Sequence, residues 1–451
     1  MALQPAVYTS TLKKILAAPR PVFNNLKAEF KTPTLTFYPY RVISFDQSCD
    51  YAGGFMEESF IEVLFTLEQY KQHVYPSRNN LLVSITHTPV SEQLGSVLQG
   101  AKNRVSKYRA QLLDAKDPGL ISIRGVSPAP GMDGNKAFYP VVFQLIPQAM
   151  DKLRFVKVGG LYSGHTPADL CKALLTQAAA GVQGTDDDKV KNIDIAKPDN
   201  VKKLQHLNVP HGTEVYNLPG YIQKKVGGIY NHDIGIFLHE QILYVYPLYD
   251  TSRFNKTEYA VDFFIIPKVQ LPTTERSYFM ESKRLSVAIT GGLKHIDLSD
   301  ARQSNEGTGT IFSLATKSFD GFAAIDENKA TFDASKTTAG IKLSDRDSKL
   351  ENAQISKNRV TDNVAAELSK VASRTGQFAQ FVWNNSDPSL LYPGMPMRLT
   401  FDSSEGTQQM YGCVVAVESH TEPNNPSFTA DVYQTNTSVV VFYTKQPPLK
   451  A

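Results

Sequence analysis

The feature that most constrains the fold is a period of two in the hydrophobic pattern. Between Ser59 and Glu68 the apolar residues Ile61, Val63, Phe65 and Leu67 alternate with Glu62, Leu64, Thr66 and Glu68. This alternation is typical of a strand with one face more buried. Further strand-like segments run from Thr34 to Phe45, Leu81 to Thr88, Leu120 to Val126 and Tyr139 to Ile146. The first part of the chain is therefore expected to be mainly β.

One segment of this region allows two interpretations. Helical spacing relates Leu94, Val97, Leu98, Ala101, Val105, Tyr108 and Leu112. Gly95 and Gly100 weaken that helix, and the stretch RVSKYRAQLL could instead be a strand, so residues 102–113 stay open between the two. A basic run, Lys102, Arg104, Lys107 and Arg109 around Tyr108, crosses this segment. The net charge of the chain is only +3, which favours a solvated face over a phosphate-binding track.

From about Phe155 the pattern becomes helical. Thr166 suits a helix N-cap and Pro167 its first turn. An apolar stripe then extends to Gly181 and consists of Leu170, Cys171, Leu174, Leu175 and Ala178. The polar tract that follows contains Asp186, Asp187 and Asp188. Calcium loops space their acids at alternate positions around a glycine, so three consecutive acids before a lysine favour a solvated loop.

The stretch from Leu218 to Leu248 predicts a short helix followed by a hairpin. Pro219 fits the first turn of the helix, and Gly227 ends it. The hairpin arms are expected from Ile229 to Leu238 and from Gln241 to Tyr246, with His239 and Glu240 as the turn.

Two His-acid pairs in this stretch, His232-Asp233 and His239-Glu240, raise the question of a metal or catalytic site. A zinc site needs three or four converging ligands, usually from a helical pair or a tight loop pair. Neither pair offers that spacing, and no HExxH occurs. We interpret the stretch as a structural element.

Other candidate chemistry is equally sparse in the sequence. No nucleophile elbow, P-loop or dinucleotide fingerprint is present. The acid pairs Glu57-Glu58 and Glu275 with Glu281 cannot be distinguished from surface charge. The cysteines, Cys49, Cys171 and Cys413, form no CxxC pair, and we expect them to be small buried hydrophobes. The single tryptophan, Trp383, lies in a strand pattern and is expected in the core. We therefore predict no catalytic, cofactor-binding or metal-binding residues, no cofactor, and no enzyme activity.

Length and composition indicate an ordered protein of several domains. The chain has 451 residues, of which 41% are apolar and 20% charged, so roughly two to four domains of about 100–150 residues are expected. No apolar run approaches the roughly 20 residues of a membrane helix. Lys13 and Lys14 interrupt the apolar patch near the N-terminus, which is the wrong order for a signal peptide. Synthesis in the cytoplasm, without a membrane, is expected.

Several patches together resemble the central hub proteins of phage tail baseplates. The stretch VGGLYSGHTPADLCKALL comes first, and GIY at Gly228–Tyr230 and LYVYP at Leu243–Pro247 follow it. Near the C-terminus, PGMPMRLTF at Pro393–Phe401 precedes GCVVAVESHT at Gly412–Thr421. The resemblance covers about half of the chain, and its order is more specific than any single patch. The long polar segment from Ser299 to Ser373 departs from the shorter members of that family.

The resemblance implies a mainly β chain with two antiparallel barrels of the tail-tube type and a small α+β domain. We expect a first barrel with an N-terminal arm in residues 1–150 and the helix-and-hairpin domain in 151–270. A second barrel would occupy residues 271–451, built from strands between Tyr278 and Thr290 and between Phe378 and Tyr443. The polar insertion 299–373 would interrupt it, with its best helix from Asp362 to Ala372.

In function, the resemblance implies a structural virion protein. It would be a homotrimeric hub that joins the tail tube or distal tail proteins to the central spike, with the tape measure protein as a further partner, and that forms part of the DNA channel without sequence-specific contacts. Two alternatives remain open. One is a tail-tip protein that binds a receptor or carbohydrate, and the other is a tail-associated cell-wall hydrolase.

Overall fold

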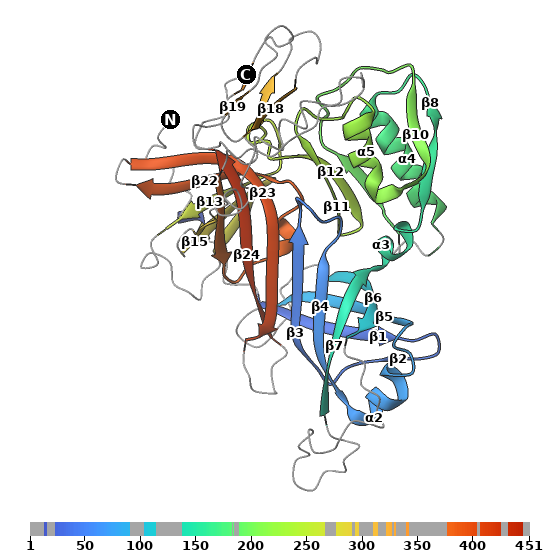
Figure 1. Ribbon diagram of the computed structural model, residues 1–451. Coiled ribbons are helices and arrows are strands. Elements are labelled where there is room, and N and C mark those ends of the chain that lie inside the picture. Colours follow the sequence, from blue (N-terminus) through green and yellow to red (C-terminus); the bar gives the residue numbers. More distant parts are fainter. Residues whose placement is uncertain are drawn as a thin grey trace.

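One sheet of fifteen strands carries most of the fold, as the computed structural model shows (Figure 1). The structure describes residues 13–15, 23–90, 103–113, 138–182, 184, 189–266, 277–290, 377–403, 406–424 and 432–444, together with five short strands between 294 and 341. The expectation of a mainly β chain with a small α+β part is confirmed. From the N-terminal region the sheet takes β1 (Phe23–Lys31), β2 (Thr36–Phe37), β3 (Arg41–Asp50), β4 (Glu58–Thr66), β5 (Leu81–Val90), β6 (Arg104–Leu112) and β7 (Phe138–Pro147).

The remaining strands of this sheet come from the second half of the chain. They are β13 (Ala260–Ile265), β14 (Tyr278–Glu281), β15 (Arg284–Ile289), β16 (Lys294–Ile296), β21 (Gln377–Trp383), β22 (Pro396–Ser403), β23 (Gly406–Pro423) and β24 (Tyr433–Thr444). Segments far apart in sequence are therefore neighbours, with C-terminal β24 and β23 beside N-terminal β3 (Figure 1).

Strand pairings close a ring around the first core. In order, β23, β3, β4, β7, β6, β5, β1 and β24 pair antiparallel, and β24 returns to β23. The link from β1 to β24 is a single residue pair, Asn24 with Tyr433. The first barrel was expected from residues 1–150 alone, and this expectation is wrong, because two C-terminal strands complete it.

The interior of this ring is filled by the alternate residues of its strands. Ile61, Val63 and Phe65 are fully buried, as the period of two in β4 predicts. Phe30 lies among the rings of neighbouring strands, 5.2 Å from Phe65 in an edge-on contact. Tyr433 of β24 belongs to the same cluster, and its hydroxyl donates to the carbonyl of Val42 at 2.9 Å. Burial of these side chains is the main force that closes the ring.

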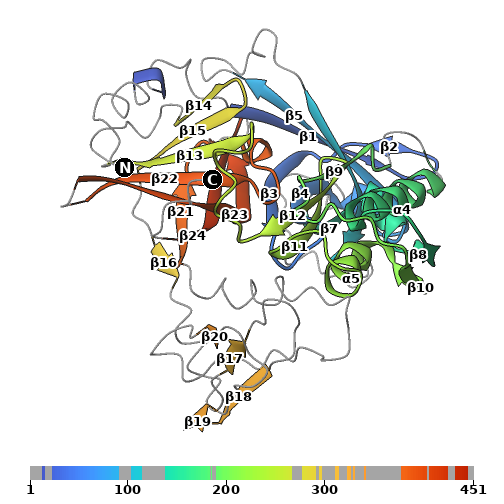
Figure 2. The ribbon, with the colours of Figure 1, turned by 90° about the horizontal axis from the view of Figure 1, so that it is seen from above.

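The second half of the sheet is not wholly antiparallel, contrary to the expectation of a second antiparallel barrel. β13 pairs in parallel with both β15 and β22, and within the described residues no pairing closes this half into a ring. β13 lies in the range 151–270 that the sequence assigns to the middle domain, yet it lies within the large sheet. Seen from above, β14, β15, β13 and β22 lie to one side of the ring strands (Figure 2).

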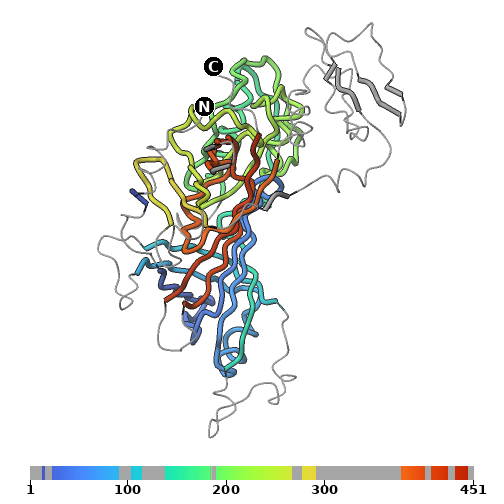
Figure 3. The backbone as a smooth tube through the Cα atoms, turned by 90° about the vertical axis from the view of Figure 1, so that its left-hand side faces the viewer, coloured from blue at the N-terminus to red at the C-terminus, as the bar shows by residue number. Residues whose placement is uncertain are grey.

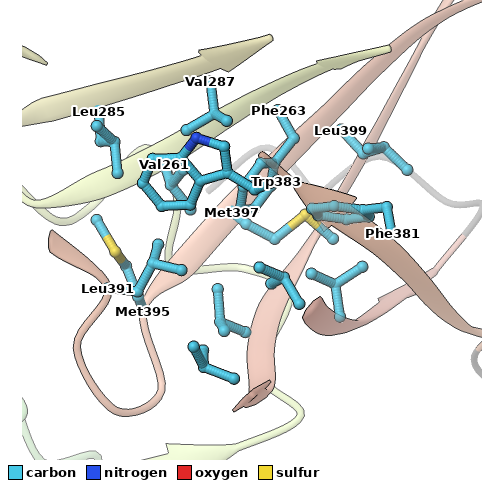
Figure 4. Packing of buried hydrophobic residues seen from close by; sticks show 14 of the residues in the cluster. Val261, Phe263, Leu285, Val287, Phe381, Trp383, Leu391, Met395, Met397 and Leu399 are labelled. Atoms are coloured by element: carbon cyan, nitrogen blue, oxygen red, sulfur yellow. The ribbon is translucent and has the colours of Figure 1, made fainter. Parts of the chain in front are cut away.

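Trp383 lies at the centre of the core of this second half (Figure 4). The side chain is fully buried, as expected, and its indole N–H donates to the Ser277 hydroxyl at 2.9 Å. Tyr278 packs edge-on against it with ring centroids 5.2 Å apart. Around them lie Val261, Phe263, Leu285, Val287, Phe381, Leu391, Met395, Met397 and Leu399. A buried aromatic of this size contributes about 3–5 kcal/mol to stability when compared with alanine.

A separate α+β unit lies beside the ring (Figures 1 and 2). Its elements are α3 (Gln148–Leu153), β8 (Lys157–Tyr162), α4 (Pro167–Gly181), β9 (Asn192–Ile195), β10 (Leu207–Glu214), a 3₁₀ turn (Val215–Asn217), α5 (Leu218–Lys225), β11 (Asp233–His239) and β12 (Ile242–Leu248). The Thr166 side chain accepts from the backbone N–H of Asp169 at 3.1 Å, which confirms the predicted cap of α4. The predicted apolar stripe of α4 is buried in the core of the unit.

The predicted hairpin is confirmed, but its turn was misplaced by one residue. β11 and β12 pair from Asp233–Leu248 to His239–Ile242, so His239 ends a strand. Glu240 and Gln241 form the turn, with φ of 46° and 66°, the values that a tight hairpin turn requires.

The structure decides the conformation of residues 104–112 but leaves other predicted segments undescribed. Residues 104–112 form a strand, which settles the choice between helix and strand there. A helix of three residues, α2 (Leu67–Gln69), continues into a π-helical turn (Tyr70–Val74). Leu120–Val126, the aspartates 186–188 and the helix at 362–372 lie outside the described residues. From the polar insertion the structure describes β17 (Thr310–Ser313), β18 (Phe322–Asp326), β19 (Lys329–Ala330) and β20 (Gly340–Ile341), a four-stranded sheet.

A glycine in β23 gives a direct test of the packing in the large sheet. A Cβ at Gly412 would lie 1.8 Å from the carbonyl oxygen of Phe442, and backbone cannot yield as a side chain can. We expect Gly412→Ala to lower the free energy of unfolding by about 3 kcal/mol or more, measured by urea denaturation with Trp383 fluorescence.

The matched control is Gly220→Ala in α5, where a Cβ meets nothing within 4 Å. Alanine favours a helix over glycine by about 1 kcal/mol, so this variant should be neutral or slightly more stable. Equal loss of stability in the two variants would contradict the register of β23 with β24.

Candidate functional site

A cavity of about 540 Å³ lies where three parts of the fold meet. The mouth of the ring supplies Glu57 and the first half of β6, and the hairpin supplies residues 238–241. The third wall is a 3₁₀ turn (Pro388–Leu390) that joins β21 to β22. Residues that the sequence left apart, namely the His239-Glu240 pair, Glu57, and Arg104 and Lys107 of the basic run, therefore line one space.

His239 is one of the residues that line this cavity. The residue is partly exposed as a whole, but both ring nitrogens are shielded from solvent, and within the described residues neither makes a hydrogen bond of good geometry. Burial is the main effect that lowers the pKa of His239, and Glu240 and Glu57 only partly oppose it. His239 is therefore a neutral imidazole at the wall of the cavity.

The second histidine of the stretch lies elsewhere. His232 is absent from the cavity lining, and its Nε2 lies 4.0 Å from the carboxylate of Asp250. The structure thus does not bring the two His-acid pairs together, in line with their interpretation as separate structural residues.

Arg104 joins the walls of the cavity. Its guanidinium lies 3.4 Å from the carboxylate of Glu240 on the hairpin and 3.7 Å from that of Asp387 before the 3₁₀ turn. The Arg104 side chain is 29% exposed and its two partners 44% and 41%. Ion pairs this exposed contribute about 1 kcal/mol or less and weaken with salt.

Glu57 also lines the cavity. The amide of Gln47 donates to its carboxylate at 3.2 Å, and the same nitrogen lies 3.4 Å from the Tyr108 hydroxyl. Burial, followed by the nearby Glu57 charge, raises the pKa of Tyr108 well above its usual value. Glu58, by contrast, is exposed on the outer face of the sheet, so the Glu57-Glu58 pair is split between two faces.

The other residues that the sequence raised as candidates do not gather into a reactive or metal-binding cluster within the described residues. All three cysteines are buried, as expected, and burial raises the pKa of each thiol, that of Cys413 to about 12. Glu281 forms an exposed ion pair with Lys14 at 2.8 Å, while Glu275 and Lys102 lie outside the described residues. Across the described part of the chain, no group of three or more His, Cys, Asp or Glu side chains is placed to hold a metal ion. Its helices include none that is long and apolar enough to span a bilayer.

A second feature is acidic and was not found from the sequence. Outward-facing positions of β4, β3 and β23 carry the carboxylates of Glu58, Glu62, Asp46, Glu418 and Glu422, and we call these the acidic face. His420 lies among them and pairs with Asp46 and, at 3.4 Å, with Glu422. The face continues across β24 to Val382 of β21, which lines the same shallow depression as Glu58 and Glu418. Only the strand order reveals this face, because its acids come from positions 46 to 422.

Comparison with known proteins gives likeness in structure alone. The chain matches no protein-family model and no curated protein sequence. A 43 kDa prophage tail protein from Shewanella oneidensis aligns with a TM-score of 0.46 and 8% identity, over 93% of this chain and 99% of that one. A tail protein from Neisseria meningitidis aligns with a TM-score of 0.43 and 8% identity, over 93% and 96%.

A component of the Escherichia coli type VI secretion system, described as structurally similar to bacteriophage T4 tail proteins, aligns with a TM-score of 0.40 and 8% identity, over 93% of this chain and 80% of that one. These structure neighbours are of the kind that the sequence patches resemble.

The two histidines of these sites should titrate in opposite directions. The hydrogen bond with Asp46 is the main effect that raises the pKa of His420, and burial lowers that of His239. At pH 6.5, the usual value for histidine, NMR of ¹³C-labelled histidine rings should show His420 mainly charged and His239 mainly neutral. Stability from His420 is then present below pH 6.5 and lost as pH rises through its folded pKa, whereas the His239 contribution is present above pH 6.5 and lost as pH falls.

Asp46→Asn is the matched variant, since it removes the main partner of His420 and leaves the cavity intact. It should return the His420 titration toward pH 6.5 and leave that of His239 unchanged. A His239 ring that titrates at or above pH 6.5 would contradict its buried, neutral state.

Proposed function

We propose that this chain is a structural component of a phage-type tail baseplate, and that three copies form a hub joining the tail tube to the central spike around a DNA channel. The acidic face supports this proposal most. It spans consecutive strands of one sheet, so it offers a continuous wall rather than a local patch.

The charge of that face suits the lining of a DNA channel. Duplex DNA binds proteins mainly through contacts of Lys and Arg with phosphate. Carboxylates at five outward positions would repel phosphates, so DNA would pass without being held. A net charge of +3 for the whole chain shows that this acidity is a property of the face and not of the protein.

The strands that both halves of the large sheet share, β23 and β24, suit a structural protein that bears mechanical load. Both halves of the large sheet contain β23 and β24, so pulling one half away from the other requires breaking a continuous ladder. A trimer of such chains would present six strand-rich halves to a six-fold tube and three α+β units outside them.

Three of the patches that carry the sequence resemblance lie on strands that join parts of the fold. Pro393–Phe401 leads into and through most of β22, and Gly412–Thr421 lies within β23. Leu243–Pro247 lies in β12, the strand that packs the α+β unit against the second half through Tyr246. These three patches therefore lie where the units are joined, while residues 158–175 and 228–230 lie within the α+β unit.

One observation favours the alternative of a carbohydrate- or receptor-binding protein. A second cavity of about 490 Å³ is lined by Tyr244, Tyr259 and Tyr392 beside Asp194 and Arg253, and aromatic walls with a few polar groups are typical of small-ligand sites. Tyr244 and Tyr392, however, stack on each other with centroids 6.0 Å apart, and Lys283 lies over the Tyr259 ring. The faces of these rings are therefore already engaged by other side chains of the chain, and the hub is better supported than a carbohydrate-binding site.

The decisive measurement is the mass of the assembly in solution. Native mass spectrometry and light scattering should give three times the chain mass of 50.0 kDa, and averaged electron micrographs should show a ring with a central channel. A strict monomer at high concentration would overturn the hub, and a monomer that binds or cleaves cell-wall glycans would favour one of the two alternatives instead.

A further inference from the structure

One edge of the ring is open where β6 enters the cavity. β5 pairs with β6 along Arg104–Ala110, but β7 pairs with it only from Tyr108 to Leu112. β7 ends at Pro147, which has no N–H, and the chain turns directly into α3. Beside residues 104–107, the described part of the chain therefore places no strand on the side away from β5.

The orientation of this edge follows from a hydrogen bond next to it. The Gln148 side chain donates to the carbonyl of Tyr108 at 3.4 Å, so this carbonyl points away from β5. In an antiparallel pair, alternate residues direct both of their backbone groups to the same side. The backbone groups of Ser106 and Arg104 thus also point away from β5, and residues 103–107 line the cavity.

The opposite wall presents a second polar group without a good partner. Both ring nitrogens of His239 are buried and make no hydrogen bond of good geometry within the described residues. A neutral imidazole can donate one hydrogen bond and accept another. Buried polar groups are rarely left unsatisfied in proteins, so an occupant that pairs with the β6 edge, and with His239 once its shielded ring nitrogens are uncovered, would stabilise the site.

We propose that the cavity binds an extended segment of a partner protein, which adds as a strand to the β6 edge and carries a carboxylate side chain. Strand addition supplies backbone hydrogen bonds, and neighbouring pockets select the side chains. Four residues of strand extend about 13 Å, and a cavity of about 540 Å³ is within the usual range of ligand sites.

Arg104 is the group that would bind the carboxylate of the partner segment. Three basic side chains, Arg104, Lys107 and Lys191, and two acidic ones, Glu57 and Glu240, line the cavity, and the carboxylate of Asp387 lies 3.7 Å from the Arg104 guanidinium. Glu240 is the most displaceable of the acids, because it is 44% exposed and bound to Arg104 only by an ion pair at 3.4 Å. An incoming carboxylate would take its place on the guanidinium, with the second oxygen available for a bidentate contact.

The probe is a phage-displayed library of random peptides of about ten residues, selected on the full-length chain. We expect selected peptides to be rich in β-branched residues, to share an Asp or Glu, and to bind with micromolar Kd by fluorescence anisotropy. A library that yields no binder, or binders that share Lys or Arg instead, would overturn the proposal.

Ser106→Pro tests the strand edge. Proline removes the N–H that faces the cavity and leaves the ladder to β5 in place, which is the position where strands tolerate proline. Binding should fall at least about tenfold, whereas the control Ser106→Ala keeps the N–H and should bind as the wild type does. Unchanged affinity in Ser106→Pro would refute strand addition.

Two further measurements keep the proposal testable if that variant does not fold. In the wild-type chain, bound peptide should slow hydrogen exchange of the Arg104 and Ser106 amides and not of amides in α4. His239→Phe should weaken binding by about fivefold to tenfold and leave the fold intact, as judged by circular dichroism. Peptide that binds without protecting residues 104–106 would place the site elsewhere.

Discussion

The pairing of β23 with β24 is the constraint on which the rest of the structure depends. The two strands are in register from Tyr411–Thr444 to Pro423–Tyr433, with an irregularity between Val414 and Ala416. On the Gly412 side of this irregularity β23 pairs with β22, and beyond it with β3. These two strands therefore belong to both halves of the sheet, and Figure 3 shows the red C-terminal strands side by side with the blue N-terminal strands. The ring cannot close, and the core around Trp383 cannot form, unless this pair is in register.

A single tyrosine, Tyr246, joins the α+β unit to the large sheet. The Tyr246 ring lies so close to Gly235 and Gly394 that a Cβ there would be 2.4 Å and 2.2 Å from it. Its hydroxyl donates to the carbonyl of Tyr51 at 2.6 Å. Tyr246 thus connects the hairpin, the loop before β22 and the residue that follows β3. Its ring leaves no space for a side chain at positions 235 and 394, so both must be glycine.

Local features were readable from the sequence because their causes are local. The alternation in β4, the Thr166 cap with its stripe along α4, and the Gly227 stop each depend on residues a few positions apart. The turn at Glu240-Gln241 was placed one residue early, since it lacks the Asn-Gly or Asp-Gly signal of such turns. The completion of the ring by Tyr433, and the parallel position of β13, depend on partners hundreds of residues away or on the far side of an insertion. No window of sequence contains that information, and for the same reason the acidic face and the cavity were not found.

The cavity has firmly packed walls and a mouth that only weak ion pairs are shown to bridge. Behind it, Leu238 bridges to Met56 and its N–H donates to the Phe55 carbonyl at 2.9 Å, while Phe55 stacks on Tyr216 inside the α+β unit. These packed contacts hold the walls apart, so an occupant would not have to create the space, and a preformed site loses less affinity to ordering. At the mouth the partly exposed ion pairs of Arg104 join the walls, and such pairs are weak and sensitive to salt. A carboxylate that displaces Glu240 would therefore exchange one ion pair for another at little cost, while the hydrogen bonds along β6 would be gained in full.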